Sequence, residues 1–421
     1  MADHEKGRSP RRRALRIAVC AMVAVVVIGA GVAGYAYWKF NGNIKSVDID
    51  ASLGTARPPA ATDGSFNLLV LGSDSRAGGN GALAGGDTAD TARSDTAMVV
   101  HVNQDHSGAQ VVSIPRDTLV ARPACTDKTG KTVPAVQRAM FNSAYETGGA
   151  ACAVKTAEQL TGLRMNHYIE IDFAGFAHVI DSIGGVTVTT TVAIHDKDSG
   201  LDLAAGTHHL DGTQALAFVR TRHGIGNGSD LGRIELQKQM MKSVLQQVAG
   251  IGLFSNPVKL WSVGDTLTSS ITTDSDLASV NSLVGLAQSL RGIGPEQLAM
   301  VTLPVVTAPS DPNRVVSQQP QAGQLWAALK TDQAVPQAVL AVQPGNPATS
   351  PSGAATRPPG GSSGTAPATV PAASPSSTLS SFLSGRPGGS VTGPATGPAI
   401  GPVTGSLSGP ATGPSPVAEG R

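Results

Sequence analysis

An apolar stretch near the N-terminus constrains this chain more than any other feature. Residues 17–38 carry no charged side chain, and about 22 helical residues span about 33 Å, enough to cross the hydrocarbon of a bilayer. The basic stretch 1–16 precedes this span, so we expect it to stay in the cytoplasm, with the rest of the chain outside, in the single-pass type II orientation. Tyr35, Tyr37 and Trp38 would lie at the outer interface. A cleaved signal peptide is the alternative, but the run is long for one and ends in aromatic residues.

The C-terminal part has a composition that cannot build a core. Residues 345–421 are dominated by Pro, Gly, Ser, Thr and Ala, and a Gly-Pro pair recurs every fourth residue at Gly393, Gly397 and Gly401. Collagen requires glycine at every third position, so we expect a disordered, extended tail that acts as a spacer. The net charge of +1 gives no reason to expect a nucleic-acid partner.

Between the apolar span and the C-terminal tail, apolar runs that are typical of strands alternate with segments of helical periodicity. We expect strands at 66–71, 97–102, 110–114, 168–172, 186–192 and 297–305, and helices at 150–161, 173–183, 231–248, 276–290 and 322–329. A short element at 214–219 is expected as a strand that ends at Val219. The alternation predicts an α/β class, with one domain at 64–335 and a stalk at 39–63 that joins it to the span.

One of the three cysteines lies in the predicted membrane span, and the other two lie in the predicted domain. Cys20 lies within the predicted span and is expected to be an inert apolar residue. Cys125 and Cys152 would both lie in an oxidising compartment, where such a pair tends to form a disulfide. A metal site would need more ligands than these two and a closer spacing.

Three groups of Asp and Arg side chains occur at the ends of predicted strands. Asp74 and Arg76 follow the first strand, Arg93 and Asp95 precede the second, and the pair Arg116-Asp117 follows the third. A carboxylate pair such as Asp74 and Asp95 suits Mg²⁺, and arginines can bind phosphate oxygens bidentately. Each group taken singly would more often be a surface salt bridge. Three groups at strand ends favour a ligand site instead.

A fourth group of basic residues follows residue 219. Arg220 and Arg222 precede a glycine-rich stretch, and Arg233 and Gln237 lie four residues apart on one face of the predicted long helix. Asp230 could cap the start of this helix, and His223 is expected at the wall of the site or as a satisfied surface histidine, rather than as a base. Arginines that converge beside a helix N-terminus would bind a pyrophosphate. A nucleotide would also fit, but the chain has no P-loop and no GxGxxG fingerprint.

Together these motifs resemble the LytR-CpsA-Psr (LCP) family, in an actinobacterial form. The resemblance covers residues 64–250 well and residues up to 335 loosely. It rests on segments 71–76, 93–96, 113–118, 141–145, 148–149, 172–176, 210–216 and 220–237. One departure is Met140, where the family often has a lysine, so that either Arg138 substitutes or one phosphate contact is missing.

The resemblance implies a domain of the αβα type, with a central mixed sheet flanked by helices and a groove for a polyprenyl chain. It also implies transfer of a glycan phosphate from polyprenyl pyrophosphate to peptidoglycan. By position, the metal ligands would be Asp74 and Asp95, with Mg²⁺ as the cofactor. The residues expected to bind the pyrophosphate are Arg76, Arg93, Arg116, Arg220, Arg222, Arg233 and Gln237. Phe173, Phe176 and Ile180 would line the lipid groove, although the apolar stripe to which they belong would also suit an ordinary core.

The expected reaction is attack by an acceptor hydroxyl on the phosphorus next to the glycan, with polyprenyl phosphate as the leaving group. Arg116 and Arg222 would stabilise the developing charge, and the base would be Asp95 or Asp117. A polyprenyl pyrophosphate-binding sensor or attachment module, and a lipid pyrophosphatase, are the alternatives. A serine hydrolase is disfavoured because Ser73 and Ser113 lack the nucleophile-elbow pattern. The sequence leaves the glycopolymer open among teichoic acid, teichuronic acid, capsule and arabinogalactan.

Overall fold

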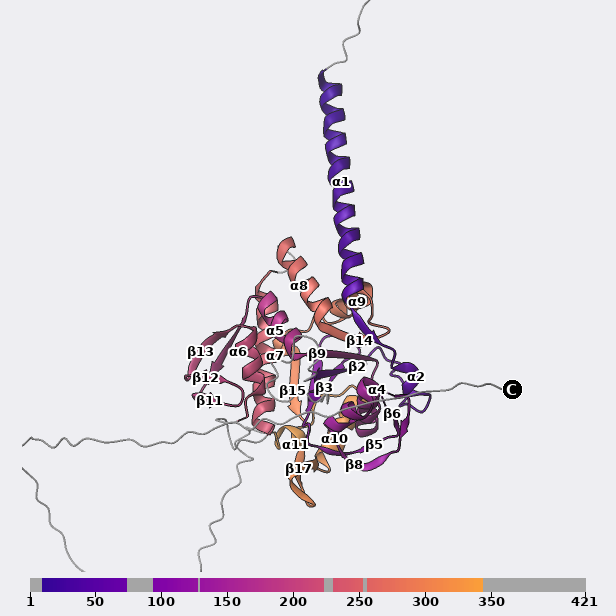
Figure 1. Ribbon diagram of the computed structural model, residues 1–421, viewed down its shortest axis with the longest axis vertical. Coiled ribbons are helices and arrows are strands. Elements are labelled where there is room, and N and C mark those ends of the chain that lie inside the picture. The colour runs from indigo at the N-terminus through magenta and orange to yellow at the C-terminus, as the bar shows by residue number, and fades with distance from the viewer. Residues whose placement is uncertain (1–9, 74–93, 128, 223–229, 253–255, 344–421) are drawn as a thin grey trace, which may run out of the picture. The chain divides into compact units, whose positions relative to one another are not determined.

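A computed structural model describes residues 10–73, 94–127, 129–222, 230–252 and 256–343 (Figure 1). The predicted tail at 345–421 lies outside these residues. The first helix, α1 (Pro10–Asn43), includes a stretch, Ala14–Asn43, that is long and apolar enough to cross a membrane. This helix covers the predicted span and extends beyond it at both ends.

A seven-stranded mixed sheet forms the centre of the described residues, in the order β1-β14-β9-β2-β3-β4-β15. β3 runs antiparallel to both β2 and β4, while β9 is parallel to β2 and β15 is parallel to β4. The strands are β1 (Lys45–Val47), β2 (Phe66–Ser73), β3 (Ser94–Val102), β4 (Ala109–Ile114), β9 (His167–Asp172), β14 (Ile271–Asp274) and β15 (Leu298–Thr302). The expected α/β class with a central mixed sheet is confirmed.

Helices cover both faces of this sheet, as Figure 1 shows. One face carries α2 (Asp50–Leu53), α4 (Phe141–Thr161), α10 (Gln321–Lys330) and α11 (Gln337–Leu340). The other carries α5 (Phe173–Ser182), α6 (Gly212–Arg220) and α7 (Asp230–Gly250), beyond which lies α8 (Pro257–Ser270). The core on the α4 face joins Leu69 and Leu71 of β2 to Val154 of α4 and Leu325 of α10. Successive strand residues point to opposite faces, so Val70 and Gly72 face α5 and α7.

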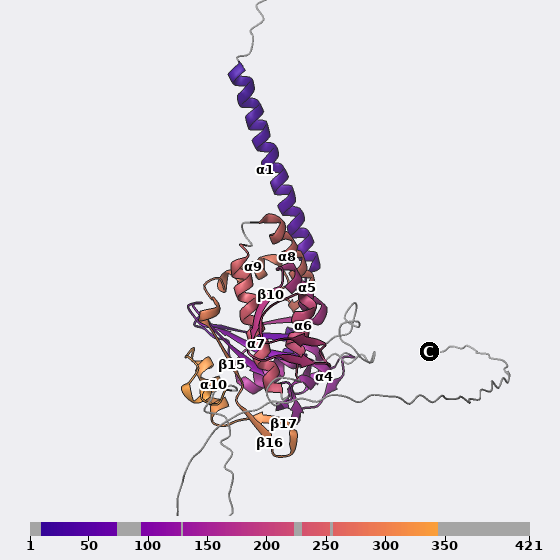
Figure 2. The ribbon, with the colours of Figure 1, turned by 90° about the vertical axis from the view of Figure 1, so that its left-hand side faces the viewer.

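Smaller elements complete the described structure. They are β5 (Leu119–Arg122), β6 (Cys125–Thr126), β7 (Thr132–Val133), β8 (Val136–Met140), β10 (Val186–Thr190), β11 (Ile194–Asp196), β12 (Leu201–Leu203), β13 (Gly206–Leu210), β16 (Val305–Ala308), β17 (Asp311–Ser317), α9 (Val280–Ser289) and the 3₁₀ turn η3 (Pro295–Gln297). Figure 2 shows β16 and β17 at the end of the domain away from α1, and Figure 1 agrees for β17.

The segment expected as a strand at 214–219 is a helix, α6, and that prediction is wrong. Asp211 and Gln214 form a capping box, in which the Asp211 carboxylate accepts from the Gln214 N–H and the Gln214 side chain accepts from the Asp211 N–H. This reciprocal pair favours a helix start, and the short apolar run that follows is compatible with either structure. The first turn therefore decides the conformation.

Two other segments differ from the expectations. The helix expected at 150–161 begins earlier, at Phe141, and changes direction at Gly148 and Gly149, where the backbone is not helical. Part of the expected stalk at 39–63 is joined to the folded unit, because β1 pairs with β14 in parallel. The sheet therefore begins a few residues after α1 ends.

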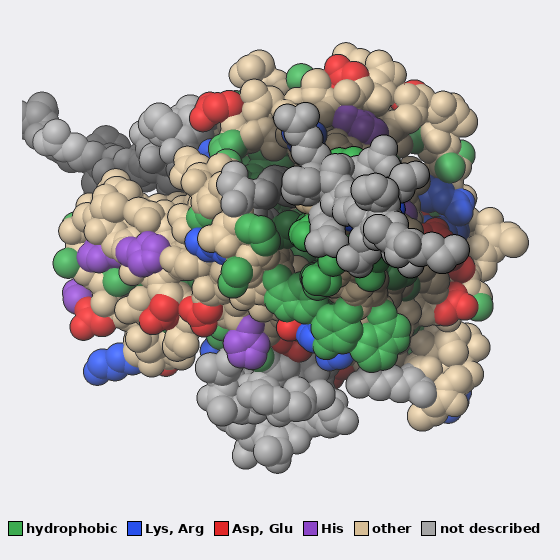
Figure 3. Space-filling view, turned by 90° about the horizontal axis from the view of Figure 1, so that it is seen from above, with side chains coloured by type: hydrophobic (Ala, Val, Ile, Leu, Met, Phe, Trp, Pro, Cys, Tyr) green, Lys and Arg blue, Asp and Glu red, His purple; other side chains and the backbone are tan. Residues whose placement is uncertain are grey.

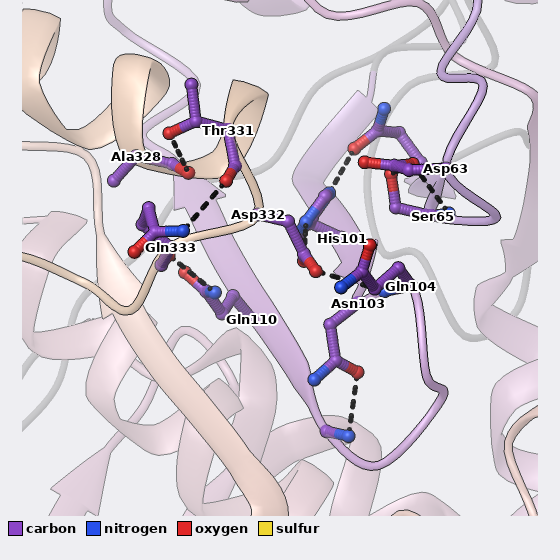
Figure 4. Close-up of polar contacts among 12 residues, drawn as sticks. Asp63, Ser65, His101, Asn103, Gln104, Gln110, Ala328, Thr331, Asp332 and Gln333 are labelled. Atoms are coloured by element: carbon purple, nitrogen blue, oxygen red, sulfur yellow. Dashed lines mark hydrogen bonds and ion pairs between the residues drawn. The ribbon is translucent and has the colours of Figure 1, made fainter.

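A buried histidine connects the sheet to the end of α10. His101 on β3 is 2% exposed, and its ring nitrogens lie 2.9 Å from Asn67 Oδ1 and 3.0 Å from Asp332 Oδ1. The other Asp332 oxygen accepts from the Gln104 N–H at 3.1 Å. Figure 4 shows Asp332 between His101 and Gln104. These contacts hold the loop after α10 against the sheet, at the opposite edge from the site described next.

Candidate active site

The carboxyl ends of β2 and β4 and the amino end of β3 meet at one edge of the sheet. Gly72 pairs with Thr96, and Ala97 pairs with Ile114, so the ends of all three strands adjoin. Two of the three predicted Asp/Arg groups are described there, at Asp95 and at Arg116-Asp117. Asp74, Arg76 and Arg93 lie outside the described residues.

Asp95 is presented by an irregularity in the sheet. Gly72 pairs with Thr96 but Ser73 pairs with Ser94, so Asp95 is the extra residue of a β-bulge. A bulge redirects the side chain that it contains, which is why such irregularities are common beside active sites. The absence of a side chain at Gly72 assists this arrangement, because a Cβ there would lie 3.1 Å from the Thr96 Cβ.

Arginine side chains surround the Asp95 carboxylate. Arg116 Nη1 donates to Asp95 Oδ1 at 2.6 Å, and Arg233 Nη2 donates to the Asp95 carbonyl at 3.1 Å. Burial acts to raise the pKa of Asp95, but Arg116, Arg233 and Arg222 outweigh it and hold that pKa below its usual range. Asp95 is therefore ionised at neutral pH, and its charge balances part of the arginine cluster.

Arg220 and Arg222 reach the site from the end of α6. Arg220 places its guanidinium carbon 4.9 Å from the centre of the Phe173 ring, a cation–π contact. The Arg222 N–H donates to Asp196 Oδ2 at 2.7 Å, while Asp196 Oδ1 accepts from the N–H groups of Asp198 and Ser199 at 2.9 and 3.3 Å. Arg222 was expected at a strand end. It instead lies just after a helix, fixed to the β11–β12 hairpin.

Arg233 and Gln237 come from one face of α7, as their spacing predicts. Arg233 is 3% exposed and Gln237 is 7% exposed. The Gln237 amide donates to Thr96 Oγ1 at 3.0 Å and to the Val219 carbonyl at 3.3 Å. Gln237 of α7 thus links β3, which carries Asp95, to the end of α6, which carries Arg220.

These elements enclose a cavity of about 180 Å³. Its lining residues are Asp95, Thr96, Phe173, Asp196, Asp198, Ser199, Val219, Arg220, Arg222, Arg233 and Gln237. Arg116 and Asp117 do not line this cavity. Asp117 instead forms ion pairs with Arg116 at 3.5 Å and with Arg314 at 3.6 Å, while Arg116 reaches the site through Asp95.

A second, apolar cavity of about 230 Å³ adjoins the first and shares Thr96, Phe173, Val219 and Gln237 with it. It lies between the sheet and α5, α6 and α7, and its walls include Val70, Met98, Ile171, Phe176, Leu216, Met240, Met241 and Val244. Phe173 and Phe176 therefore lie where a lipid groove was expected. Ile180 does not line the cavity, since it is 1% exposed and packs in the core with Val186 and Leu236.

Asp95 has the chemistry of a Mg²⁺ ligand, because it is an ionised carboxylate on the wall of an arginine-lined cavity. Its expected partner Asp74 lies outside the described residues. Within the part of the chain that the structure describes, no group of three or more His, Cys, Asp or Glu side chains could hold a metal ion. The other ligands of a metal at Asp95 would then be Asp74, water or oxygen atoms of a bound ligand.

The predicted disulfide between the two cysteines of the domain is present. Cys125 and Cys152 form a disulfide that connects β6 to α4, with Cα atoms 5.4 Å apart. Arg138, considered as a substitute for the lysine missing at Met140, is exposed and bonds to Ser310 Oγ at 3.5 Å. It does not line the arginine-rich cavity.

Comparison with known proteins identifies the family. A model of the LytR-CpsA-Psr family matches residues 36–331, which is most of the chain. The chain belongs to the LytR-CpsA-Psr family. Family members of known structure include a LytR-Csp2A-Psr enzyme from Actinomyces oris, which aligns with 68% of this chain and 96% of its own at a TM-score of 0.50 and 25% identity. B. subtilis TagV shares the fold, with a TM-score of 0.51 at 22% identity over 65% of this chain and 100% of its own.

Two curated LytR-CpsA-Psr relatives carry functional names. The cell wall biosynthesis protein LcpA of Corynebacterium glutamicum is 30% identical over 315 residues, which are 69% of this chain and 60% of LcpA. The matched region thus spans less than two thirds of LcpA. A polyisoprenyl-teichoic acid–peptidoglycan teichoic acid transferase, TagU of Bacillus mycoides, is 31% identical over 258 residues, 59% of this chain and 74% of TagU.

Several site residues of this LytR-CpsA-Psr protein were missed from the sequence. Asp196, Asp198 and Ser199 form the tip of the β11–β12 hairpin, and Met240 and Met241 line the apolar cavity. The Asp-Lys-Asp-Ser-Gly run at 196–200 gave a turn signal that could have drawn attention to this hairpin. Nothing local indicates that the turn faces Arg222, because the contact joins residues 26 positions apart.

Proposed function

We propose that this protein transfers a glycopolymer from a polyprenyl pyrophosphate carrier to peptidoglycan, forming a phosphodiester bond. One observation carries the proposal: an arginine-lined cavity and an apolar cavity adjoin and share four residues of their walls. A pyrophosphate-linked lipid has the same two parts, a dianionic head and an apolar chain. The names of TagU and LcpA support the class of reaction.

The guanidinium groups would bind and orient the pyrophosphate. Arg220, Arg222 and Arg233 line the cavity and can donate to the phosphate oxygens, and Arg116 holds the Asp95 carboxylate in place. Phe173 and Phe176 would contact the first part of the prenyl chain. This arrangement would place the phosphorus next to the glycan beside the most cationic part of the site.

In the proposed step, an acceptor hydroxyl oxygen bonds to the phosphorus next to the glycan. The bond from that phosphorus to the bridging oxygen breaks, and polyprenyl phosphate leaves with the electron pair. The hydroxyl proton passes to Asp95 or to water. Of the two candidate bases, Asp95 lines the cavity and Asp117 does not. The lowered pKa of Asp95 makes it a weak base, which is sufficient because a loose transition state places little charge on the attacking oxygen.

Mg²⁺, held by Asp95 together with Asp74, would neutralise charge on the phosphate oxygens. The arginines would do the same from the other walls of the cavity, where low local dielectric strengthens each contact. We also propose that α1 anchors the chain in the cell membrane, with residues 1–16 in the cytoplasm and the domain outside. Protease added to intact protoplasts should then degrade the domain, and full protection would contradict this orientation.

The transfer is tested by incubating the full chain in detergent with Mg²⁺ and a polyprenyl pyrophosphate-linked glycan, with and without peptidoglycan. The proposal requires polyprenyl phosphate to be released and glycan to appear on peptidoglycan only when the acceptor is present. Equal release without peptidoglycan would indicate a lipid pyrophosphatase. Binding of the donor without turnover would indicate a sensor or attachment module. Several donors, including teichoic acid and arabinogalactan precursors, would identify the glycopolymer.

A further inference from the structure

The end of α1 nearest the domain is fastened to α8 by aromatic stacking. The rings of Tyr35 and Trp261 stack with their centres 5.9 Å apart, and the Phe40 ring lies 5.1 Å from the same indole. Phe40 also packs against Gly264, where a Cβ would lie 3.2 Å from the ring. The residues of α1 that would lie at the outer membrane interface are thus in direct contact with α8.

Polar contacts strengthen this junction. Asp265 of α8 pairs with Lys39 and accepts from the Asn43 amide at 2.8 Å. The pKa of Asp265 is lowered, chiefly by the hydrogen bond from Lys39. The first N–H of α9, at Val280, donates to Asn41 Oδ1 at 2.8 Å. Both α8 and α9 are therefore attached within one or two turns of the end of α1, and Figures 1 and 2 show both helices beside that end.

These two helices expose apolar side chains instead of burying them. Of the 14 residues of α8, the buried ones are Val263 and Thr268, while Val258 is 79% exposed and Leu260 is 40% exposed. No residue of α9 is buried, and its Val284 is 48% exposed. Scattered exposed apolar residues are ordinary on a protein surface. Here they lie on two neighbouring helices and continue the apolar surface of α1.

Figure 3 views the molecule along α1 from above. The hydrophobic side chains near the centre of this view include the exposed apolar residues of α1 itself, and most of the charged and histidine side chains visible there lie toward the edge. An apolar area with a charged rim is typical of a surface that contacts a membrane or another protein, and α8 and α9 lie beside the base of α1 in this area.

We propose that α8 and α9 lie against the outer surface of the membrane that α1 crosses, with the first turn of α8 in the headgroup region. The proposal rests on α1 spanning a bilayer. Trp and Tyr favour the interface, and the Tyr35–Trp261 stack fixes the level of α8 there. Val258 lies one helical turn from Trp261, so it reaches the same layer, and interfacial helices bury their apolar faces by about 5–10 Å.

This contact would connect the membrane surface to the apolar cavity through α8 and α5. α5 packs directly on α8, since a Cβ at Gly175 would lie 2.8 Å from the Ser270 carbonyl. Phe173 and Phe176 of the same α5 line the apolar cavity. The membrane contact itself does not depend on the proposed reaction.

Spin labels on the full chain test the contact directly. In a Cys20→Ala background, with the Cys125–Cys152 disulfide kept, Val258→Cys is labelled with a nitroxide and the protein is reconstituted in phosphatidylcholine–phosphatidylglycerol vesicles. Val306→Cys on β16 is the matched control, because Val306 is 44% exposed and lies at the far end of the domain. Collision rates with oxygen, which enters lipid, and with a polar nickel chelate are then compared.

The ratio of oxygen to nickel collisions should be several-fold higher at residue 258 than at residue 306. A label at Leu267→Cys should give an intermediate value, because residue 267 lies roughly 13 Å along the helix from residue 258. Equal ratios at 258 and 306 would overturn the proposal. A label at 258 shielded from both reagents would also overturn it and would indicate a second protein on this face. Neither result depends on transfer activity, so the proposed function is tested separately.

Discussion

Asp196 accepts a 2.7 Å hydrogen bond from the backbone N–H of Arg222, although the two residues lie in different elements. Asp196 is buried, with 3% of its surface exposed. The other oxygen of its carboxylate, Oδ1, accepts from the backbone N–H groups of Asp198 and Ser199 in the same turn. A neighbouring contact between Ser199 Oγ and Thr221 Oγ1, at 2.9 Å, joins the same two segments. The hairpin therefore holds the backbone from which Arg222 enters the cavity.

Asp196→Asn should reduce transfer by displacing Arg222. An amide can accept through one oxygen, so at least one of the three N–H groups would lose its partner, at a cost of about 1–3 kcal/mol in folding stability. Donor affinity and transfer rate, measured on the same preparations as the unfolding free energy, should both fall. Asp202→Asn is the matched control on the same hairpin, because the Asp202 side chain is 82% exposed, and it should leave both quantities unchanged. Unaltered activity per folded molecule in Asp196→Asn would contradict this role.

Arg222→Ala should abolish transfer while the fold is retained. Loss of a charged contact to a developing phosphate charge costs about 3–4 kcal/mol, or on the order of 10²–10³ in rate. Arg222→Lys should also be impaired, because an ammonium cannot reproduce the planar fork of a guanidinium. Rates and melting temperatures of the same samples separate catalysis from folding. Arg138→Ala, exposed and outside the cavity, should behave like the unmodified protein. Near-normal turnover of folded Arg222→Ala would mean that the arginines stabilise the fold and take no part in transfer.

Asp95→Ala should alter the dependence on Mg²⁺. The carboxylate is ionised and lies in the cavity, so its removal should raise the Mg²⁺ concentration needed for half-maximal transfer. It also leaves Arg116 without its 2.6 Å partner, so part of the loss should persist at saturating Mg²⁺. Titration of activity with Mg²⁺ after treatment with a chelator measures both effects. An unchanged Mg²⁺ requirement would remove Asp95 from the metal site.

The positions of Asp95 and Arg116 could be predicted from the sequence, whereas that of Asp196 could not. Runs of apolar residues begin or end beside Asp and Arg in three places, and such runs mark strands whose ends carry ligand sites. The role of Asp196 depends on how a hairpin packs against the end of α6, which no local pattern encodes. The α6 error has a similar origin, since a short apolar run fits a strand or a helix. Helix α8 was missed because its apolar residues are interrupted by polar ones, and Val263 is the one apolar residue of this helix that is buried.

The acid side of the stability profile should depend on Asp274. Burial acts to raise the pKa of this carboxyl, but His167 at 3.6 Å and the N–H groups of Tyr168 and Leu277, at 2.7 and 2.9 Å, outweigh it and lower the pKa. A lowered pKa in the folded state contributes stability above the unfolded value of about 3.9, and this contribution is lost as the pH falls through the folded pKa.

Asp274→Asn should therefore destabilise the protein more at about pH 6 than at about pH 3, since the variant lacks this titration. Urea unfolding of both proteins at the two pH values gives the comparison, and other carboxyl groups cancel in the difference. A difference in unfolding free energy that grows toward low pH would have the wrong sign and would exclude the proposed linkage.

The Cys125–Cys152 disulfide should contribute to stability through the loop that it closes. The two residues are 27 positions apart, and a loop of this length corresponds to roughly 3.5 kcal/mol in the chain-entropy description. The bond also shapes α4, because Gly148 lies against it: a Cβ there would be 2.9 Å from the Cys152 Cβ and 2.6 Å from the Thr126 carbonyl. The kink at Gly148 and Gly149 thus gives the disulfide and the β6 strand room beside the helix.

Replacing both cysteines by serine should lower the unfolding free energy by about 3.5 kcal/mol without abolishing transfer, because neither residue lines the cavity. A reductant should destabilise the unmodified protein by a similar amount and leave the double variant unaffected. Cys20→Ser controls for the loss of a thiol, since Cys20 lies in α1 outside the domain core.

Gly148→Ala should destabilise the protein whether or not reductant is present, because one of its clashes is with a backbone oxygen that cannot move freely. If reductant restored the stability of Gly148→Ala, the disulfide alone would cause the strain, and the kink would be a consequence of the bond rather than of the packing against β6.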